Sequence, residues 1–227
     1  VIGYEEYIRN TYKVQIEGYY KDLKNLLTYE ETRSTTDAEV SDESLSDILT
    51  PADGYAYGLE LFGQKMTGNL SGWIAYTYSV SRKIMNSIYD VGENEYYTNW
   101  DRTHALSILG NYQINKKWET NWRLSLQSGQ AYTPIIGYYV QKFPESPEEV
   151  FRTIPGTRNS GRYDPYSRLD IGAVYHAKIG KTNVDFFFQI INTLNRSNTF
   201  RKVYSLGNTY NGLDDDGDWA KELHDVN

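Results

Sequence analysis

The sequence predicts an all-β fold, and more specifically an antiparallel transmembrane β-barrel. Three observations predict it. Hydrophobic residues alternate with polar residues along most of the chain, the alternating segments are long, and the connections between them are short and long in turn. Alternation of this kind places successive side chains on opposite faces of a β-strand.

Eight segments show the alternation: residues 1–8, 11–22, 55–66, 70–81, 103–114, 118–128, 166–177 and 184–193. The segment 118–128 is the clearest example. One of its faces carries Trp118, Thr120, Trp122, Leu124 and Leu126, and the other carries Glu119, Asn121, Arg123, Ser125 and Gln127. We interpret each segment as a strand with one apolar face directed away from water and one polar face in contact with water.

The length of these segments favours a membrane. Most of them hold 10 to 12 residues, whereas strands of ordinary globular proteins average about 5–6 residues. A strand that crosses a bilayer at a tilt needs about 9–11 residues. Aromatic residues gather near the predicted strand ends, as in the interface girdle of a membrane barrel: Tyr19, Tyr20, Tyr96, Tyr97, Trp100, Tyr138, Tyr139, Tyr163 and Tyr166.

The connections predict which end of the strands faces which side. Tight turns are expected at residues 9–10, 67–69, 115–117 and 178–182, and long structureless loops at 28–54, 82–102 and 129–165. Outer-membrane barrels have short periplasmic turns and longer extracellular loops. With the short turns in the periplasm, the first and the eighth strand both leave their free ends outside. A closed barrel of eight strands is therefore awkward, and we expect further strands before Val1 and after Asn195.

Composition excludes several other classes of protein. The 227 residues include no cysteine, which excludes a disulfide framework and a cysteine nucleophile. The net charge of −7 argues against a nucleic-acid partner. No apolar run reaches the length of about 18 residues that a membrane-spanning helix requires. No Ser-His-Asp or paired-carboxylate arrangement stands out, so we do not expect an enzyme.

Four blocks of the sequence resemble segments of a known protein family. The blocks YKVQIEGYYKDLKNLL at 12–27, YGLELFGQKMTGNLSGWIAYTYSVSR at 57–82, NWDRTHALSILGNYQINKKWETNWRLSLQSGQAYTP at 99–134 and RLDIGAVYHAKIGKTNVDFFFQIINTLNRSN at 168–198 resemble the C-terminal barrel of TonB-dependent outer-membrane receptors. The pattern Asn-x-x-Asn-Arg-x-Asn at Asn192, Asn195, Arg196 and Asn198 resembles a signature that this family carries just before its last strand. Residues 1–205 would then be a portion of the barrel, and 206–227 a polar acidic loop or tail.

The resemblance implies a barrel of about 22 strands with an N-terminal plug, in the outer membrane of a Gram-negative bacterium. It implies import of a scarce nutrient (a siderophore, glycan, peptide or vitamin) with energy delivered by TonB. Partners would be TonB through the plug region, the remaining barrel and plug segments, outer-membrane lipids and, in some cases, a surface lipoprotein. The chain shows no plug, no TonB-contacting segment and no final strand ending in an aromatic residue. Two alternatives stay open: a small autonomous eight-stranded outer-membrane protein with a structural or adhesive role, and a soluble β protein that binds a small molecule.

Three groups of residues are candidates for a site. Glu119, Asn121, Arg123 and Gln127 should line the lumen, where polar side chains tune selectivity, although hydrogen bonds to one another or to a plug are the favoured interpretation. Asp101, Arg102 and His104 resemble a strand-start motif of the family. We interpret them as structural, with Asp101 and Arg102 in an ion pair or hydrogen-bond network.

The third group is a weak calcium candidate. Asp214, Asp216 and Asp218 have the alternating spacing of calcium-binding loops. However, Gly217 falls at the fourth position of such a loop, where the sixth is required, and Asp225 stands where glutamate is preferred. A solvated acidic loop is therefore favoured, and no other metal or cofactor is expected.

Overall fold

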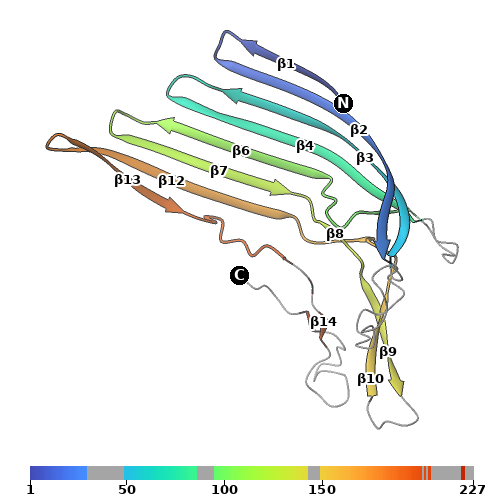
Figure 1. Cartoon of the computed structure of the whole chain (residues 1–227). Coiled ribbons are helices and arrows are strands. Elements are labelled where there is room, and N and C mark those ends of the chain that lie inside the picture. Colours follow the sequence, from blue (N-terminus) through green and yellow to red (C-terminus); the bar gives the residue numbers. More distant parts are fainter. Residues whose placement is uncertain are drawn as a thin grey trace.

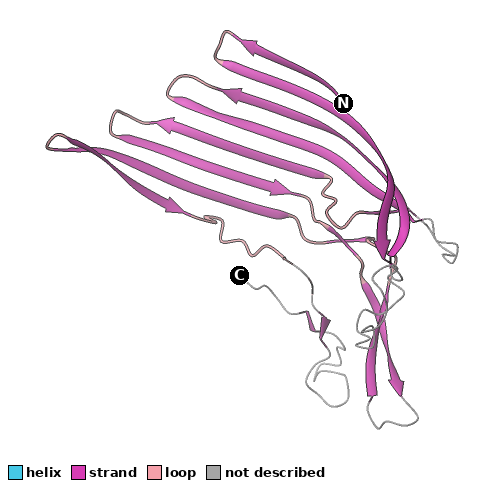
Figure 2. Ribbon diagram, in the orientation of Figure 1, coloured by secondary structure: helices cyan, strands magenta, loops and turns pink. Residues whose placement is uncertain are grey.

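The computed structural model describes residues 1–29, 49–85, 95–142, 149–200, 202, 204–205 and 221–222. All regular secondary structure in this part of the chain is β-strand (Figure 2). Within the same residues, no helix is long and apolar enough to cross a membrane. The predicted all-β, antiparallel fold is therefore confirmed.

Eight long strands form one antiparallel sheet in the order β1-β2-β3-β4-β6-β7-β12-β13 (Figure 1). They are β1 (Ile2–Ile8), β2 (Tyr12–Tyr29), β3 (Leu49–Lys65), β4 (Leu70–Met85), β6 (His104–Gln113), β7 (Trp118–Gln127), β12 (Tyr166–Ile179) and β13 (Thr182–Ile190). Each coincides with one of the eight predicted segments. The short strand β5 (Glu95–Tyr97) pairs with β4 beside β6.

Tight turns join the strands at one end of this sheet (Figure 1). Arg9 and Asn10 adopt positive φ angles of 51° and 52° between β1 and β2, and Gly68 and Gly180 do so in two of the other turns, with φ of 92° and 63°. Such backbone conformations reverse a chain within a few residues. We call this end of the sheet the turn end and the opposite one the loop end.

The loop end is more regular than predicted. Strands β2, β3 and β4 have 18, 17 and 16 residues, so they extend well into the expected loops. The prediction of a structureless loop over residues 129–165 is wrong. That segment holds the hairpin of β9 (Ile135–Lys142) and β10 (Glu149–Pro155), and the short pair of β8 (Ala131–Tyr132) with β11 (Gly161–Arg162). The run Ile-Ile-Gly-Tyr-Tyr-Val at 135–140 is rich in the residues that favour strands.

The main sheet is a single curved layer that does not close (Figure 1). β1 and β13 are its two ends, and each has one partner among the described strands. In the described residues no large side chain is fully buried. Four of the six buried hydrophobic residues, Ala52, Met85, Tyr96 and Ala131, lie at the loop end. A small separate pair is formed by β14 (Tyr204–Ser205) and β15 (Lys221–Glu222).

Candidate functional site

The register of the sheet divides its side chains between two faces. Residues directly opposite one another in antiparallel strands share a face. One row across six strands is Val14, Gly63, Ile74, Ile108, Leu124 and Leu169, and the next row is Gln15, Phe62, Ala75, Ser107, Ser125 and Arg168. We call the face of the first row the apolar face and that of the second the polar face. The polar face also carries an aromatic pair, Phe62 and Trp73, with ring centroids 6.2 Å apart.

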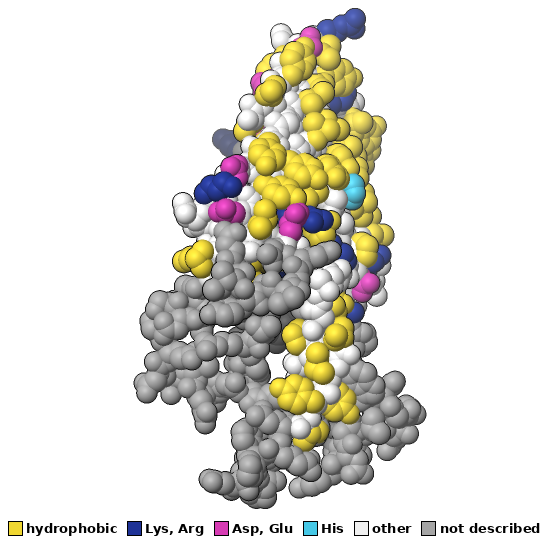
Figure 3. Space-filling model, turned by 90° about the vertical axis from the view of Figure 1, so that its right-hand side faces the viewer, with side chains coloured by type: hydrophobic (Ala, Val, Ile, Leu, Met, Phe, Trp, Pro, Cys, Tyr) yellow, Lys and Arg dark blue, Asp and Glu magenta, His cyan; other side chains and the backbone are white. Residues whose placement is uncertain are grey.

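The apolar face is exposed along the sheet. Ile74, in the middle of the row, is 47% exposed, Ile16 is 43% exposed and Phe188 at the β13 edge is 57% exposed. Figure 3 shows hydrophobic side chains gathered over the upper part of the molecule in that view. A soluble protein normally covers a surface of this kind with a second layer of secondary structure, and no described segment of this chain does so.

Two rows of aromatic side chains bound the apolar face. At the turn end, the Trp118 ring packs at a tilt against Tyr175, with 4.7 Å between the ring centroids, and the Tyr175 centroid lies 6.4 Å from that of Phe186. At the loop end, Tyr55 lies between Tyr20 and Tyr57, at 6.4 and 6.3 Å. Tyr12 and Tyr20 mark the two levels on β2, and eight residues of strand separate them by about 26 Å. Only the loop-end row, through Tyr20, includes a residue of the predicted girdle.

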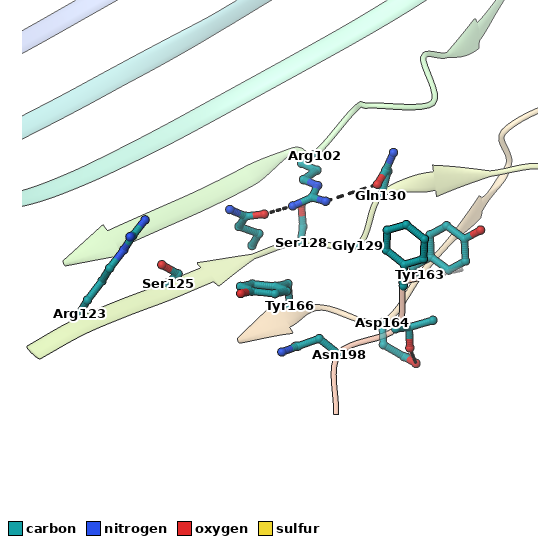
Figure 4. A pocket seen from close by; sticks show the side chains of 13 residues that line it. Arg102, Arg123, Ser125, Ser128, Gly129, Gln130, Tyr163, Asp164, Tyr166 and Asn198 are labelled. Carbon is teal, nitrogen blue, oxygen red and sulfur yellow. Dashed lines mark hydrogen bonds between the residues drawn. The ribbon is translucent and has the colours of Figure 1, made fainter. Parts of the chain in front are cut away.

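A cavity of about 440 Å³ opens on the polar face near the loop end (Figure 4). Its lining comes from the connection before β6, β7 and the residues after it, the start of β12 with the residues before it, and the segment after β13. The lining residues are Arg102, Arg123, Ser125, Gln127, Ser128, Gly129, Gln130, Tyr163, Asp164, Tyr166, Asn198, Thr199 and Phe200. Backbones approach closely at its rim, since a Cβ on Gly129 would overlap the carbonyl group of Tyr163. Only glycine permits this approach.

The cavity brings together some of the predicted residues and leaves others out. Arg123 and Gln127 line it, and Arg102 donates hydrogen bonds to the amide oxygens of Gln127 and, at 3.3 Å, of Gln130. Glu119 and Asn121 lie on the polar face of β7 but nearer the turn end, outside the cavity lining. Glu119 approaches His176, with 3.9 Å between the carboxylate and Nε2.

The segment after β13 lines one side of the cavity. Its Asn198 side chain bonds to the backbone of β12, as a neighbouring strand would do. Asn198 accepts a hydrogen bond from the Ser167 amide at 2.9 Å and donates one to the Ser167 carbonyl oxygen at 3.0 Å. Asp170 accepts the Asn192 amide at 2.9 Å and pairs with Nε of Arg168 at 2.8 Å. The two Asn198 bonds satisfy the backbone groups of Ser167 in β12 beyond the point where β13 ends, and the Asp170 side chain anchors the start of the following segment through the Asn192 amide.

The residues of the family-like signature lie in this segment. Asn192 and Asn195 have positive φ angles of 53° and 47°, a conformation that asparagine tolerates better than most residues. The side chain of Asn192 accepts a hydrogen bond from the Arg196 amide and donates one to the Arg196 carbonyl. Arg196 in turn donates to the Pro165 carbonyl at 3.1 Å. Their visible role is to shape the chain beside the cavity.

Asp101 and Arg102 do not form an ion pair with each other. Asp101 is buried, and it pairs with Arg162 at 2.6 Å while accepting the Ser81 amide at 2.7 Å. The Arg162 guanidinium also lies over the Tyr97 ring, 4.4 Å from its centroid, and that of Arg82 lies 4.2 Å from the same centroid. Asp101 and Arg102 therefore each belong to a polar network, but their partners are Arg162 and Ser81 for Asp101, and Gln127 and Gln130 for Arg102.

Beside this network, Glu95 holds β5 against the sheet. Its carboxylate accepts a hydrogen bond from Tyr55 at 2.5 Å and pairs with Arg82 at 2.9 Å. Both contacts favour the charged carboxylate, and they hold the pKa of Glu95 below its usual range, with the Tyr55 hydrogen bond as the larger cause.

His104 lies on the apolar face. Its Nδ1 is 2.8 Å from the Tyr76 hydroxyl, and its ring packs against Tyr76 and Tyr78. These contacts fit the structural role predicted for it. Asp214, Asp216 and Asp218, the calcium candidates, lie outside the described residues. Among the described residues no group of histidine and acidic side chains is placed to hold a metal ion.

Several residues of the site were missed by sequence reasoning. Arg162 and Asp164 lie in a connection that was expected to lack structure, and Phe200 follows the last predicted strand; Tyr163 was expected only in the aromatic girdle, and Asn198 only in the family-like signature. For Arg162 the sequence offers no signal, because its partner Asp101 is 61 positions away. The hydrogen bonds of Asn198 to the Ser167 backbone agree with the general tendency of asparagine to bond to backbone groups.

Comparisons with models of known protein families, with curated proteins and with solved structures found no match for this chain.

Proposed function

We propose that this chain is part of the barrel of an outer-membrane TonB-dependent transporter, which binds and imports a scarce nutrient. One observation carries the membrane assignment: an uncovered apolar face lies between two aromatic rows. The rows lie about 26 Å apart along β2, and at the strand tilt of about 35–45° in outer-membrane barrels this is about 19–22 Å along the membrane normal, close to but somewhat less than their apolar band of about 25 Å.

The open sheet supports a barrel larger than eight strands. The backbone groups along the free edges of β1 and β13 must be paired in a bilayer, because lipid offers no hydrogen-bond partners. We propose that further strands complete the wall, to about 22 strands as the family resemblance implies. The polar face would then line the lumen, with the loop end outside the cell and the turn end in the periplasm.

In this arrangement the chain supplies wall and binding surface rather than chemistry. A nutrient entering from the loop end would meet the cavity beside Arg102 and Arg123. A plug elsewhere in the protein would close the lumen, and TonB would open it. The described residues of the polar face offer hydrogen-bond donors and acceptors to the nutrient, which is how large barrels tune selectivity.

Orientation can be tested by labelling, because the sequence contains no cysteine. Ile136→Cys, an exposed position in β9, and Lys116→Cys, an exposed position in a tight turn, form the matched pair. In intact cells a membrane-impermeant maleimide should label the first variant alone, and both after the outer membrane is permeabilised. Equal labelling of both variants in intact cells would contradict the proposed orientation.

Transport is tested by uptake of labelled ferric siderophore, oligosaccharide, peptide and cobalamin. Cells that lack the gene should lose uptake of one of these, and cells that lack TonB should lose the same uptake. If uptake of all four is independent of the gene, the transport proposal fails even where the labelling result holds.

A further inference from the structure

The cavity on the polar face carries more positive than negative charge, in a chain whose net charge is −7. Its charged lining residues are Arg102, Arg123 and Asp164, two cations and one anion. Figure 4 shows Arg123 and Ser125 on β7 and Arg102 in the connection that leads into β6, beside the end of β7. Local positive charge of this kind attracts an anion.

Arg123 has donors to spare. Asp170 lies opposite it in the register, but that carboxylate is already engaged by Arg168 at 2.8 and 3.1 Å and by the Asn192 amide at 2.9 Å. Within the described residues the guanidinium of Arg123 interacts with the charge of Asp170, but no hydrogen bond and no ion pair at contact distance joins the two side chains. A guanidinium presents five N–H donors in a planar fork.

Arg102 is held in place without being neutralised. Its two hydrogen bonds go to the amide oxygens of Gln127 and Gln130, which carry no charge. The side chain is therefore oriented toward the cavity while its positive charge stays available. Ordering of this kind in advance reduces the entropy lost when a ligand binds.

The remaining lining offers hydroxyl, amide and aromatic groups. Ser125, Ser128 and Asn198 are hydrogen-bonding groups, and Tyr163 and Tyr166 provide aromatic surface. Arg123 and Gln127 are four residues apart on one strand, which sets their Cα atoms about 13 Å apart. A cavity of about 440 Å³ between them falls within the usual range for small-molecule sites.

We propose that this cavity binds an acidic small molecule through Arg123 and Arg102, with a carboxylate or phosphate group as the recognised chemistry. Arginine forms bidentate, charge-assisted hydrogen bonds with either group. The inference rests on the proposed function, in which the polar face lines the lumen, and it names the ligand class of that lumen.

The probes are citrate, inorganic phosphate and, as a neutral compound, glucose. The protein is purified in detergent from the outer membrane of the cells that express it, with isotope-labelled arginine. The Nε–H signals of its arginines are then followed by NMR at constant ionic strength. The signals of Arg123 and Arg102 should shift with citrate, with phosphate or with both, and the signal of Arg9, in a tight turn, should stay in place. A response to citrate alone identifies carboxylates, and a response to phosphate alone identifies phosphates.

Variants provide the second readout. Arg123→Gln should weaken binding of the active probe about tenfold or more, Arg123→Lys should weaken it less, and Arg9→Gln should leave it unchanged. Native signals that do not move with either acid, that move equally with glucose, or an affinity that Arg123→Gln leaves intact would overturn the proposal. Labelling of Ile136→Cys in intact cells is measured separately, so failure of the ligand assignment and failure of the membrane assignment are distinguishable.

Discussion

The buried carboxylate of Asp101 forms an ion pair with Arg162 at 2.6 Å and joins the segment before β6 to the short strand β11. The Asp101 side chain is 1% exposed and that of Arg162 is 31% exposed. Arg162 also donates to the carbonyl oxygens of Asp101 and Gly129 at 2.9 and 3.3 Å. This contact fixes one side of the loop end, where the cavity lies.

Asp101→Asn should destabilise the protein by about 2–3 kcal/mol, because it leaves the Arg162 charge without its partner in a partly dry site. The midpoint of urea unfolding in detergent micelles measures this loss. Lys24→Gln is the control, since the Lys24–Asp22 pair is exposed and such pairs contribute less than about 1 kcal/mol. Equal shifts of the two midpoints would show that the Asp101 contact is not structural.

Gly110→Ala should destabilise the sheet. Gly110 lies opposite Trp122, and a Cβ at that position would overlap the Trp122 ring. Displacing the ring from its packing costs about 1–3 kcal/mol. Gly18→Ala, on the same face with no atom within 4 Å of the added Cβ, should leave the unfolding midpoint almost unchanged. Equal effects of the two substitutions would argue against this packing.

Replacing Asn195 by glycine should preserve stability, and replacing it by a β-branched residue should lower it. Glycine readily adopts the φ angle of 47° found there, whereas valine in this conformation is strained by about 1–2 kcal/mol. Asn195→Gly should therefore keep the native unfolding midpoint, and Asn195→Val should lower it. Hydrogen exchange of residues 191–198 should increase in the valine variant only. Similar behaviour of the two variants would mean that the backbone conformation at Asn195 is not required.

Glu95 should make the attachment of β5 sensitive to acid. Its pKa in the folded protein is lowered from the ordinary value of 4.5, first by the Tyr55 hydrogen bond and then by that of Arg82. A carboxyl group of this kind stabilises the fold above its ordinary pKa, and the stabilisation is lost as the pH falls through the lower folded-state pKa.

Hydrogen exchange of residues 95–97, corrected for the intrinsic pH dependence of exchange, measures this effect. Protection should be constant down to about pH 5 and should fall below about pH 4. Glu95→Gln should remove the pH-dependent component. Protection that falls in the native protein and in the variant alike would assign the acid sensitivity to another group.

All eight strands of the main sheet could be predicted because alternation is a local property. The apolar and polar faces of a strand can be recognised from its own sequence, as with the neighbouring residues Trp122 and Arg123 on β7, without knowledge of distant residues. The tight turns were equally visible, since Gly68 and Gly180 lie where the alternation stops. The β9–β10 hairpin was missed because its run of alternation is short and proline and glycine interrupt it.

The candidate site was only partly predictable. Arg123 and Gln127 follow from the polar face of a single strand. The cavity that contains them also depends on Arg102, Tyr163 and Asn198, which come from three connections. The positions of connections depend on contacts between residues that are distant in sequence. For example, the Asn159 side chain donates hydrogen bonds to the Tyr97 carbonyl oxygen at 2.5 Å and to the Asn99 side-chain oxygen at 2.7 Å. No local pattern encodes such contacts.

Contact of the apolar face with lipid is the central feature of the proposed membrane assignment, and two neighbouring residues of β6 test it directly. Ile108 lies on the apolar face and Ser107 on the polar face, and the absence of native cysteine lets each be labelled alone as Ile108→Cys or Ser107→Cys with a fluorescent probe. In liposomes, quencher-bearing lipids should quench the probe at position 108, and aqueous iodide should quench the probe at 107. Quenching of both probes by iodide, with no response to the lipid quencher, would contradict the membrane assignment.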